Sequence, residues 1–118
     1  MKYMLLMYAD ETKAPRTVEE YQAVAQVWYS FNEEAKAAGV LLSTNGLEPI
    51  ASATTIRVRE GKTSITDGPF AETHEQLGGY YLLECKDLDE AIRWAEKIPT
   101  ATYGSIEVRP LNQWSQIA

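Results

Sequence analysis

The chain has 118 residues and a mass of 13.3 kDa, so we expect one domain spanning residues 1–118. Apolar residues make up 45% and charged residues 24%, which is typical of a globular domain and excludes a disordered acidic tail or a fibrous repeat. The net charge of −6 repels phosphate backbones and anionic lipids, so neither nucleic acid nor a membrane is an expected partner.

The first predicted element is a central strand, because residues 3–9 are apolar on both alternating faces. A helix is predicted to begin after Thr17, since Glu20 three residues later completes a reciprocal capping pair. Gly39 is the expected helix terminator. The predicted inward stripe of this helix consists of Val18, Tyr21, Val24, Ala25, Trp28, Phe31 and Ala35.

The middle of the chain is predicted to contain turns and then a hairpin. Asn45-Gly46 and Pro49 are typical of turns, with room for a short strand between them. Residues 54–67 alternate between apolar and polar side chains and reverse direction at Gly61-Lys62, which predicts two antiparallel strands.

The last third of the chain predicts a second central strand, a helix and an edge strand. Residues 80–85 are again apolar on both faces, and Gly78-Gly79 before them indicates a kink or bulge. Asp87 is the expected N-cap of a helix that Pro99 ends. Residues 105–111 alternate, and their proline favours a place at the edge of the sheet.

This order of elements is a split βαβ pattern, so the predicted fold class is α+β, ferredoxin-like, with a mainly antiparallel sheet. Both helices are expected to cover one face of that sheet. Because strands 3–9 and 80–85 are apolar on both sides, the other face is expected to meet a second copy of the chain. The sequence therefore predicts a homodimer with a barrel-like space between two sheets, where a small molecule can bind.

The segment Thr66–Tyr81 collects most of the residues that can carry chemistry. It contains Asp67-Gly68-Pro69-Phe70, and it is flanked by the segments Ala53–Arg59, Asp87–Ala95 and Ile106–Pro110. On these stretches the chain resembles the YCII-related family, in the branch named after the Asp-Gly-Pro-Phe (DGPF) signature.

The resemblance implies a dimeric α/β barrel of two ferredoxin-like subunits. It also implies a link to extracytoplasmic-function sigma factors, because some family members are encoded beside them or fused to them. An enzymatic role has been proposed for the family on the basis of a His–Asp pair whose histidine lies in the first helix. The predicted first helix has no histidine, and Trp28 stands near the expected place, so only Asp67 carries over from that pair.

Asp67 and His74 are the candidate catalytic residues. Asp67 is predicted to act as a general base or ligand anchor in the inter-subunit pocket; the alternative is that its carboxylate accepts backbone amides of the Asp-Gly-Pro turn. His74 is the single histidine, and an imidazole with an ordinary pKa near 6.5 suits proton transfer; the alternative is a solvated loop residue.

Four residues are candidates for ligand binding. Arg57 and Arg59 share a strand face, and Arg109 shares a face with Glu107, so their planar guanidinium groups can hold a carboxylate or phosphate. The alternative for each arginine is an ion pair or simple solvation. Tyr81 brings a phenol near the pocket, although strand tyrosines are commonly core or interface residues.

The sequence predicts no metal and no cofactor, because it has a single histidine, a single cysteine and no Gly-rich phosphate loop; the alternative is a metal site of His74 with Glu72 or Asp67. Cys85 cannot form an internal disulfide, and the N-terminus turns acidic too early for a signal peptide, so a cytoplasmic location is expected.

Three functional hypotheses remain open at this point. One is an enzyme that acts on a small polar or aromatic molecule in the dimer pocket. The second is a non-catalytic ligand-binding or regulatory module associated with sigma-factor-linked transcription control. The third is a purely structural dimer, in which side chains fill the space between the sheets.

Overall fold

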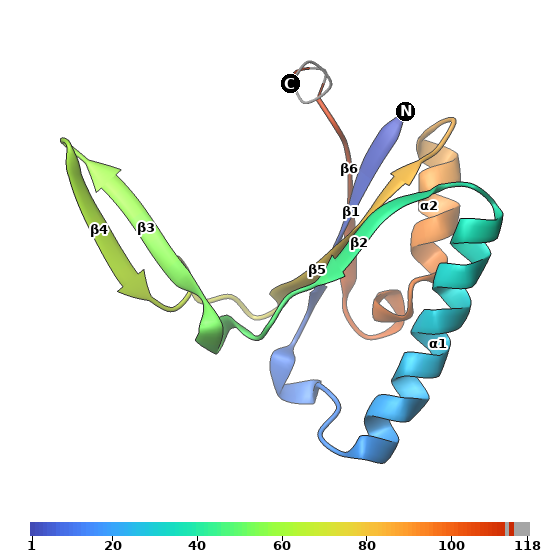
Figure 1. The fold of residues 1–118 in the computed structure, drawn as a ribbon, viewed down its shortest axis with the longest axis horizontal. Helices are drawn as coiled ribbons and strands as arrows, with labels where there is room; N and C mark the ends of the chain where they lie inside the picture. The colour runs from blue at the N-terminus through green and yellow to red at the C-terminus, as the bar shows by residue number, and fades with distance from the viewer. Residues whose placement is uncertain (113, 115–118) are drawn as a thin grey trace.

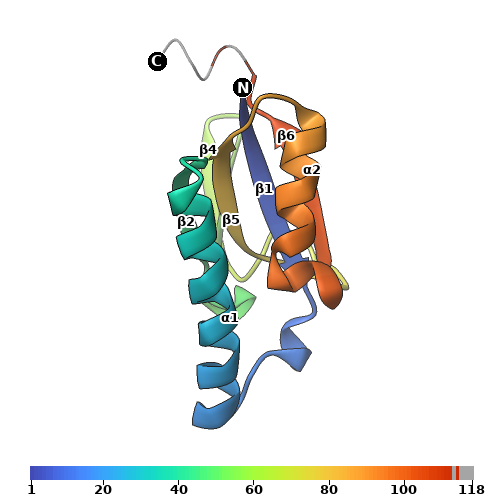
Figure 2. The same ribbon diagram turned by 90° about the vertical axis from the view of Figure 1, so that its right-hand side faces the viewer.

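The structure is a computed structural model that describes residues 1–112 and 114. Its main body is a four-stranded antiparallel sheet with two helices packed on one face, as Figures 1 and 2 show. A separate two-stranded hairpin projects away from this body (Figure 1). The strands are β1 (Lys2–Ala9), β2 (Leu41–Gly46), β3 (Thr54–Arg59), β4 (Lys62–Asp67), β5 (Gln76–Glu84) and β6 (Ser105–Pro110). The helices are α1 (Val18–Ala37) and α2 (Leu88–Lys97), with three short 3-10 helices at Glu11–Lys13, Ile50–Ser52 and Pro99–Thr102.

The strand order β2-β5-β1-β6, with α1 and α2 on one side, confirms the predicted ferredoxin-like α+β fold. β1 and β5 are the two central strands, and β6 with its Pro110 lies at an edge, as predicted. The register between β1 and β5 shifts beside Gly78 and Gly79, which confirms the predicted bulge. None of the described helices is both long and apolar enough to cross a membrane.

Both helices begin where their capping residues predict. The Thr17 hydroxyl accepts a hydrogen bond from the Glu20 amide at 3.1 Å, and the Asp87 carboxylate accepts one from the Glu90 amide at 2.9 Å. The Glu20 carboxylate accepts from the backbone N–H of Arg16 at 2.7 Å, one residue before the expected partner.

Two predictions along the chain are wrong. Asn45-Gly46 is the end of edge strand β2, not a turn, because these residues pair with Tyr80 and Gly79 of β5. The hairpin turns at Glu60-Gly61, one residue earlier than expected, and both residues have positive φ, as a tight two-residue turn requires.

The predicted inward stripe of α1 is correct only in its second half. Phe31 and Ala35 are buried and Trp28 packs against them, whereas Val18 and Tyr21 are exposed. The first turns of α1 extend beyond the end of the sheet, as Figure 2 shows, so no strand lies beneath them. This overhang leaves space between the helix and the end of the sheet.

The side chains on the two faces of the sheet differ in burial. Side chains facing the helices, such as Leu5, Tyr81 and Leu83, are fully buried. The opposite face carries Met4 and Leu6, which alternate with those residues and remain partly exposed. The described chain thus covers only one of the two apolar faces that the sequence predicts.

Candidate functional site

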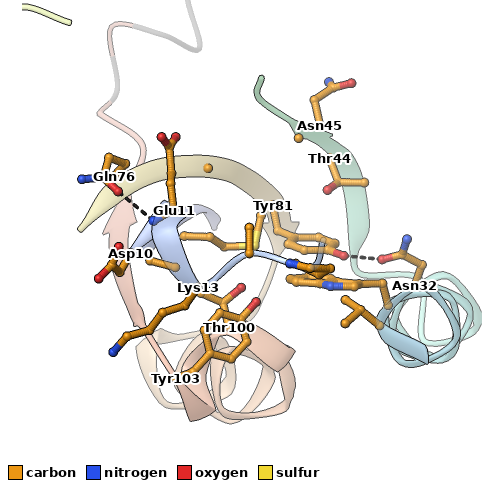
Figure 3. Close-up of a pocket in the computed structure, with 18 residues that line it drawn as sticks. Asp10, Glu11, Lys13, Asn32, Thr44, Asn45, Gln76, Tyr81, Thr100 and Tyr103 are labelled. Atoms are coloured by element: carbon orange, nitrogen blue, oxygen red, sulfur yellow. Dashed lines mark hydrogen bonds between the residues drawn. The ribbon is translucent and has the colours of Figure 1, made fainter. Parts of the chain in front are cut away.

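The overhang of α1 creates a cleft of about 750 Å³ between that helix, the loop after β1 and the ends of β1, β2 and β5 (Figure 3). The cleft lies on the helix side of the sheet, so it is distinct from the predicted space between two sheets. Its lining residues are Met7, Ala9, Asp10, Glu11, Lys13, Ala14, Pro15, Val24, Trp28, Asn32, Thr44, Asn45, Gly46, Gln76, Gly78, Tyr81, Thr100 and Tyr103.

Aromatic rings form the inner wall of the cleft. The Trp28 and Tyr81 rings are nearly parallel, with centroids 6.2 Å apart and an angle of 10° between planes. Phe31 contacts Tyr81 edge-on, with 4.9 Å between the ring centroids and 74° between the ring planes. Because Phe31 is itself packed in the core, it fixes Tyr81, and Tyr81 in turn supports Trp28.

The Tyr81 hydroxyl donates a hydrogen bond to the side-chain oxygen of Asn32 on α1, as Figure 3 shows. Burial raises the pKa of the Tyr81 phenol, so the hydroxyl stays protonated at neutral pH and acts as a donor. The amide nitrogen of Asn32 is left as a donor in the cleft wall.

Glu11 and Gln76 fix the loop that closes the cleft on the side of β1. Gln76 accepts a hydrogen bond from the backbone N–H of Glu11 at 2.9 Å and donates one to the carbonyl of Thr73 at 2.6 Å. The Glu11 carboxylate accepts from the backbone N–H of Ile50 at 3.0 Å. These bonds connect the loop after β1 with the segments on either side of the hairpin.

The rim of the cleft is polar and mostly neutral. The hydroxyl of Thr44 donates to the carbonyl of Tyr80 at 2.9 Å, and the Asn45 side chain donates to the Tyr80 hydroxyl at 3.0 Å. Asp10 accepts hydrogen bonds from the backbone and hydroxyl of Thr12, and these bonds lower the pKa of its carboxyl.

Comparison with known families and proteins identifies the family of this chain. The model of the YCII-related domain matches residues 1–115. The chain belongs to the YCII-related family. An uncharacterised protein of Rhizobium meliloti (strain 1021) is 40% identical over 114 residues, which cover 94% of this chain and 92% of that protein.

A solved structure shares the fold of this YCII-related protein. It is a 5-chloro-2-hydroxyhydroquinone dehydrochlorinase from Burkholderia phenoliruptrix, in complex with 2,5-dihydroxybenzoquinone. The TM-score is 0.51 over 95% of this chain and 94% of that one. At 12% sequence identity the likeness concerns the fold alone.

Of the six residues predicted from the sequence, Tyr81 lines the cleft of this YCII-related protein. Asp67 ends β4, where it pairs with Thr54 at the base of the hairpin. His74 is exposed in the loop before β5, close enough to Asp10 for its charge to help lower the pKa of that carboxyl. The catalytic roles of Asp67 and His74 stay predictions.

The three predicted arginines lie on strands outside the cleft. Arg57 donates to the carbonyl of Phe70 at 3.5 Å, and Arg59 donates to the carbonyl of Val58 at 3.2 Å, both within the hairpin region. Arg109 forms an ion pair with Glu107 at 2.9 Å, and that hydrogen bond raises the pKa of the guanidinium group. Their predicted roles in ligand binding also remain predictions.

Several cleft residues were not singled out from the sequence. Asn32 had a usable signal, because it follows Trp28 by one helical turn and therefore shares its face of α1. Glu11 and Gln76 had none, since they are far apart in the chain and the fold alone brings them together. Trp28, near the place where the family resemblance implies a histidine, lines the cleft with its indole ring.

Within residues 1–112 and 114, no group of three or more His, Cys, Asp or Glu side chains is arranged to hold a metal ion. The charged side chains in the lining are Asp10, Glu11 and Lys13. The cleft therefore presents apolar and aromatic walls, neutral hydrogen-bonding groups and a small net negative charge.

Proposed function

We propose that this YCII-related protein binds a small planar molecule with hydroxyl or carbonyl substituents in the cleft beneath α1. The observation that carries this proposal is the combination of a parallel Trp28–Tyr81 wall with neutral donors and acceptors around it. A volume of about 750 Å³ lies in the range typical of ligand pockets. Flat rings pack well against aromatic walls, and amides fix the orientation of polar substituents.

The charges of the cleft favour an uncharged ligand. Strong recognition of a carboxylate or phosphate commonly uses the planar fork of arginine, and no arginine is among the lining residues that the structure describes. Among the described lining residues Lys13 is the one cation, and Asp10 and Glu11 accompany it. An anionic ligand would meet more negative than positive charge here.

Hydroxylated benzenes are suitable first probes. The dehydrochlorinase of similar fold was solved with a dihydroxybenzoquinone, a planar ring with oxygen substituents. Hydroquinone, catechol and 1,2,4-trihydroxybenzene offer the same shape without a permanent charge. Binding is measured by quenching of tryptophan fluorescence and by isothermal titration calorimetry.

Substitution of Asn32 tests the site directly. Asn32→Leu keeps the approximate side-chain volume but removes both the acceptor of the Tyr81 hydroxyl and the free amide donor, so we expect binding at least about tenfold weaker. Gln22→Leu is the matched control, because Gln22 is exposed on the same helix and outside the cleft. Equal affinity of the two variants, or no binding of any probe at millimolar concentration, would contradict the proposal.

A catalytic role is a second candidate, and the observation in its favour is the carboxylate of Glu11 in the cleft lining. The bond from the Ile50 amide holds this carboxylate in place and leaves lone pairs able to take a proton from a bound hydroxyl group. Chromatography of the recovered probe distinguishes the two candidates, since a binding protein returns it unchanged. If turnover is found, Glu11→Gln should abolish it, and Asp67→Asn and His74→Ala test the residues predicted from the sequence.

We further propose the narrower assignments made from the sequence, namely the DGPF branch of the family and a homodimer formed through the open face of the sheet. The partly exposed Met4 and Leu6 on that face support the homodimer, because an apolar sheet face of this kind is usually covered. Analytical ultracentrifugation tests the oligomeric state.

A further inference from the structure

The hairpin β3–β4, residues 54–67, is here called the arm. It pairs with itself and forms no strand ladder with the four-stranded sheet. Figure 1 shows that it projects from the lower end of the sheet on the side opposite the helices. The arm therefore stands beside the open face of its own sheet without belonging to that sheet.

The arm is amphipathic across its two faces. Ile56 pairs directly with Ile65, and Val58 lies two residues further on the same face. These three side chains are 63%, 67% and 56% exposed, respectively. The other face carries the three basic side chains Arg57, Arg59 and Lys62. One face of the arm is thus suited to water and the other to burial.

Within a single chain the arm has no surface against which its apolar side chains can pack. An isolated two-stranded hairpin is at best marginally stable in water, because it has no third layer against which to bury its apolar side chains. Its side-chain hydrogen bonds are local, such as those from Thr55 to the carbonyl of Gly68 and from Arg57 to the carbonyl of Phe70. A covering surface must come from elsewhere.

The dimensions of the chain show how much surface is left uncovered. The radius of gyration is 16.4 Å, whereas a compact domain of this length has about 13.5 Å. The accessible surface is 8432 Å², whereas a compact protein of 13.3 kDa exposes about 6,500 Å². Stable interfaces bury roughly 800 Å² per partner, so the excess is ample for a dimer.

We infer that the arm packs its Ile56–Val58–Ile65 face against the four-stranded sheet of a second copy of this chain. The arm and the open face of the sheet lie on the same side of the molecule. In a twofold-symmetric dimer, one partner therefore covers both apolar surfaces, since each arm packs on the sheet of the other chain. The inference rests on the proposed homodimer and is independent of ligand binding in the cleft.

If each arm packs on the sheet of the other chain, an arrangement called the exchange below, the position of Asp67 also follows. It lies on the apolar face of the arm, two residues beyond Ile65, so an exchanged arm brings its carboxylate to the partner subunit. The inter-subunit position predicted for Asp67 from the sequence is then provided by the arm of the neighbouring chain.

Cysteine scanning on the two faces of β4 tests the inference. The native Cys85 is buried, so Ile65→Cys and Ser64→Cys each introduce one accessible thiol, on opposite faces of the same strand. In the dimer we expect the thiol of Ile65→Cys to react with a disulfide reagent at least about tenfold more slowly than that of Ser64→Cys. After dilution to the monomer, the two rates should become equal.

A second pair of variants measures the energetic effect. Ile65→Asp should raise the dimer dissociation constant at least about tenfold, because it places a carboxylate in an apolar interface, whereas Ser64→Asp should leave the constant nearly unchanged. Circular dichroism and probe binding should be the same for both variants, since the arm contributes nothing to the cleft lining.

Three outcomes would overturn the inference. A chain that stays monomeric at all concentrations would rule out both the homodimer and the exchange. A dimer in which both introduced thiols react equally fast, or which Ile65→Asp leaves intact, keeps the dimer but shows that the arm is not part of its interface. Loss of probe binding with an intact dimer would concern only the cleft.

Discussion

Both the body of the molecule and its arm carry large apolar side chains on antiparallel strands, but these side chains differ in burial. Leu5 and Leu83 in the body are fully buried, whereas Ile56 and Ile65 in the arm are 63% and 67% exposed. All four belong to antiparallel strands in which successive side chains point to opposite faces. The apolar side chains of a strand therefore identify a face that is suited to burial, but they do not show which surface covers it.

The difference arises from the connections. β1 leads into α1 and β5 into α2, so the chain itself returns a helix to the face of the sheet that these strands bury. The arm is preceded by a 3-10 helix and followed by a loop, and neither brings a helix onto it. The stability of the body is therefore intramolecular, whereas that of the arm should depend on protein concentration.

The largest effect is expected from a truncation in the body. Leu5→Ala removes a side chain that is completely buried between the sheet and the helices, so it should lower the free energy of unfolding by about 2–5 kcal/mol at every protein concentration. Denaturant unfolding followed by circular dichroism measures this loss.

Ile56→Ala is the matched change in the arm. At concentrations where the protein is monomeric it should leave the unfolding of the body unchanged, because Ile56 is exposed there. At higher concentrations it should weaken the dimer. If Ile56→Ala lowered the free energy of unfolding of the monomer as much as Leu5→Ala does, the arm would belong to the core.

The next effect concerns Cys85 in the body. Burial, assisted by the nearby carboxylate of Glu90, raises the pKa of this thiol to about 11. The folded state therefore holds the proton more tightly than the unfolded state does. The resulting stability is complete below about pH 8.5 and is lost as the pH rises towards 11, by roughly 2 to 3 kcal/mol in total.

Denaturant unfolding of the native chain and of Cys85→Ala between pH 8 and pH 11 checks this dependence. As the pH rises, the free energy of unfolding of the native chain should fall relative to that of the variant. Parallel plots of the two free energies against pH would contradict a buried thiol. Ser64→Cys serves as the counterpart in the arm, since an exposed thiol adds no such pH dependence.

A smaller effect is expected from two glycines. A Cβ at Gly79 would lie 2.8 Å from the carbonyl oxygen of Asn45 and 2.9 Å from the terminal methyl of Met7, so Gly79→Ala should force β2 away from β5 and cost about 2 kcal/mol. Gly61 in the arm has φ of +75° and open space around its Cβ position. Gly61→Ala should strain only the hairpin turn, by about 1 kcal/mol, and leave the unfolding midpoint of the body unchanged.

The candidate site was less predictable than the fold. The elements follow from local signals such as the Thr17 and Asp87 caps, and their order limits the topology to few arrangements. The cleft depends on how far α1 overhangs the sheet and on a contact between Glu11 and Gln76, and neither leaves a local pattern. The signature around Asp67 directs attention to the arm, whereas the cavity of the single chain is on the other side of the sheet.

The sequence by itself determined the two long helices, every strand except β2, and the apolar faces, because caps, turns and periodicity act over a few residues. Only the tertiary structure decided that residues 41–46 form an edge strand of the sheet, that Trp28 and Tyr81 line a cleft, and that the arm stands uncovered. The physical reason is that burial is a property of two surfaces, and a sequence pattern describes only one of them.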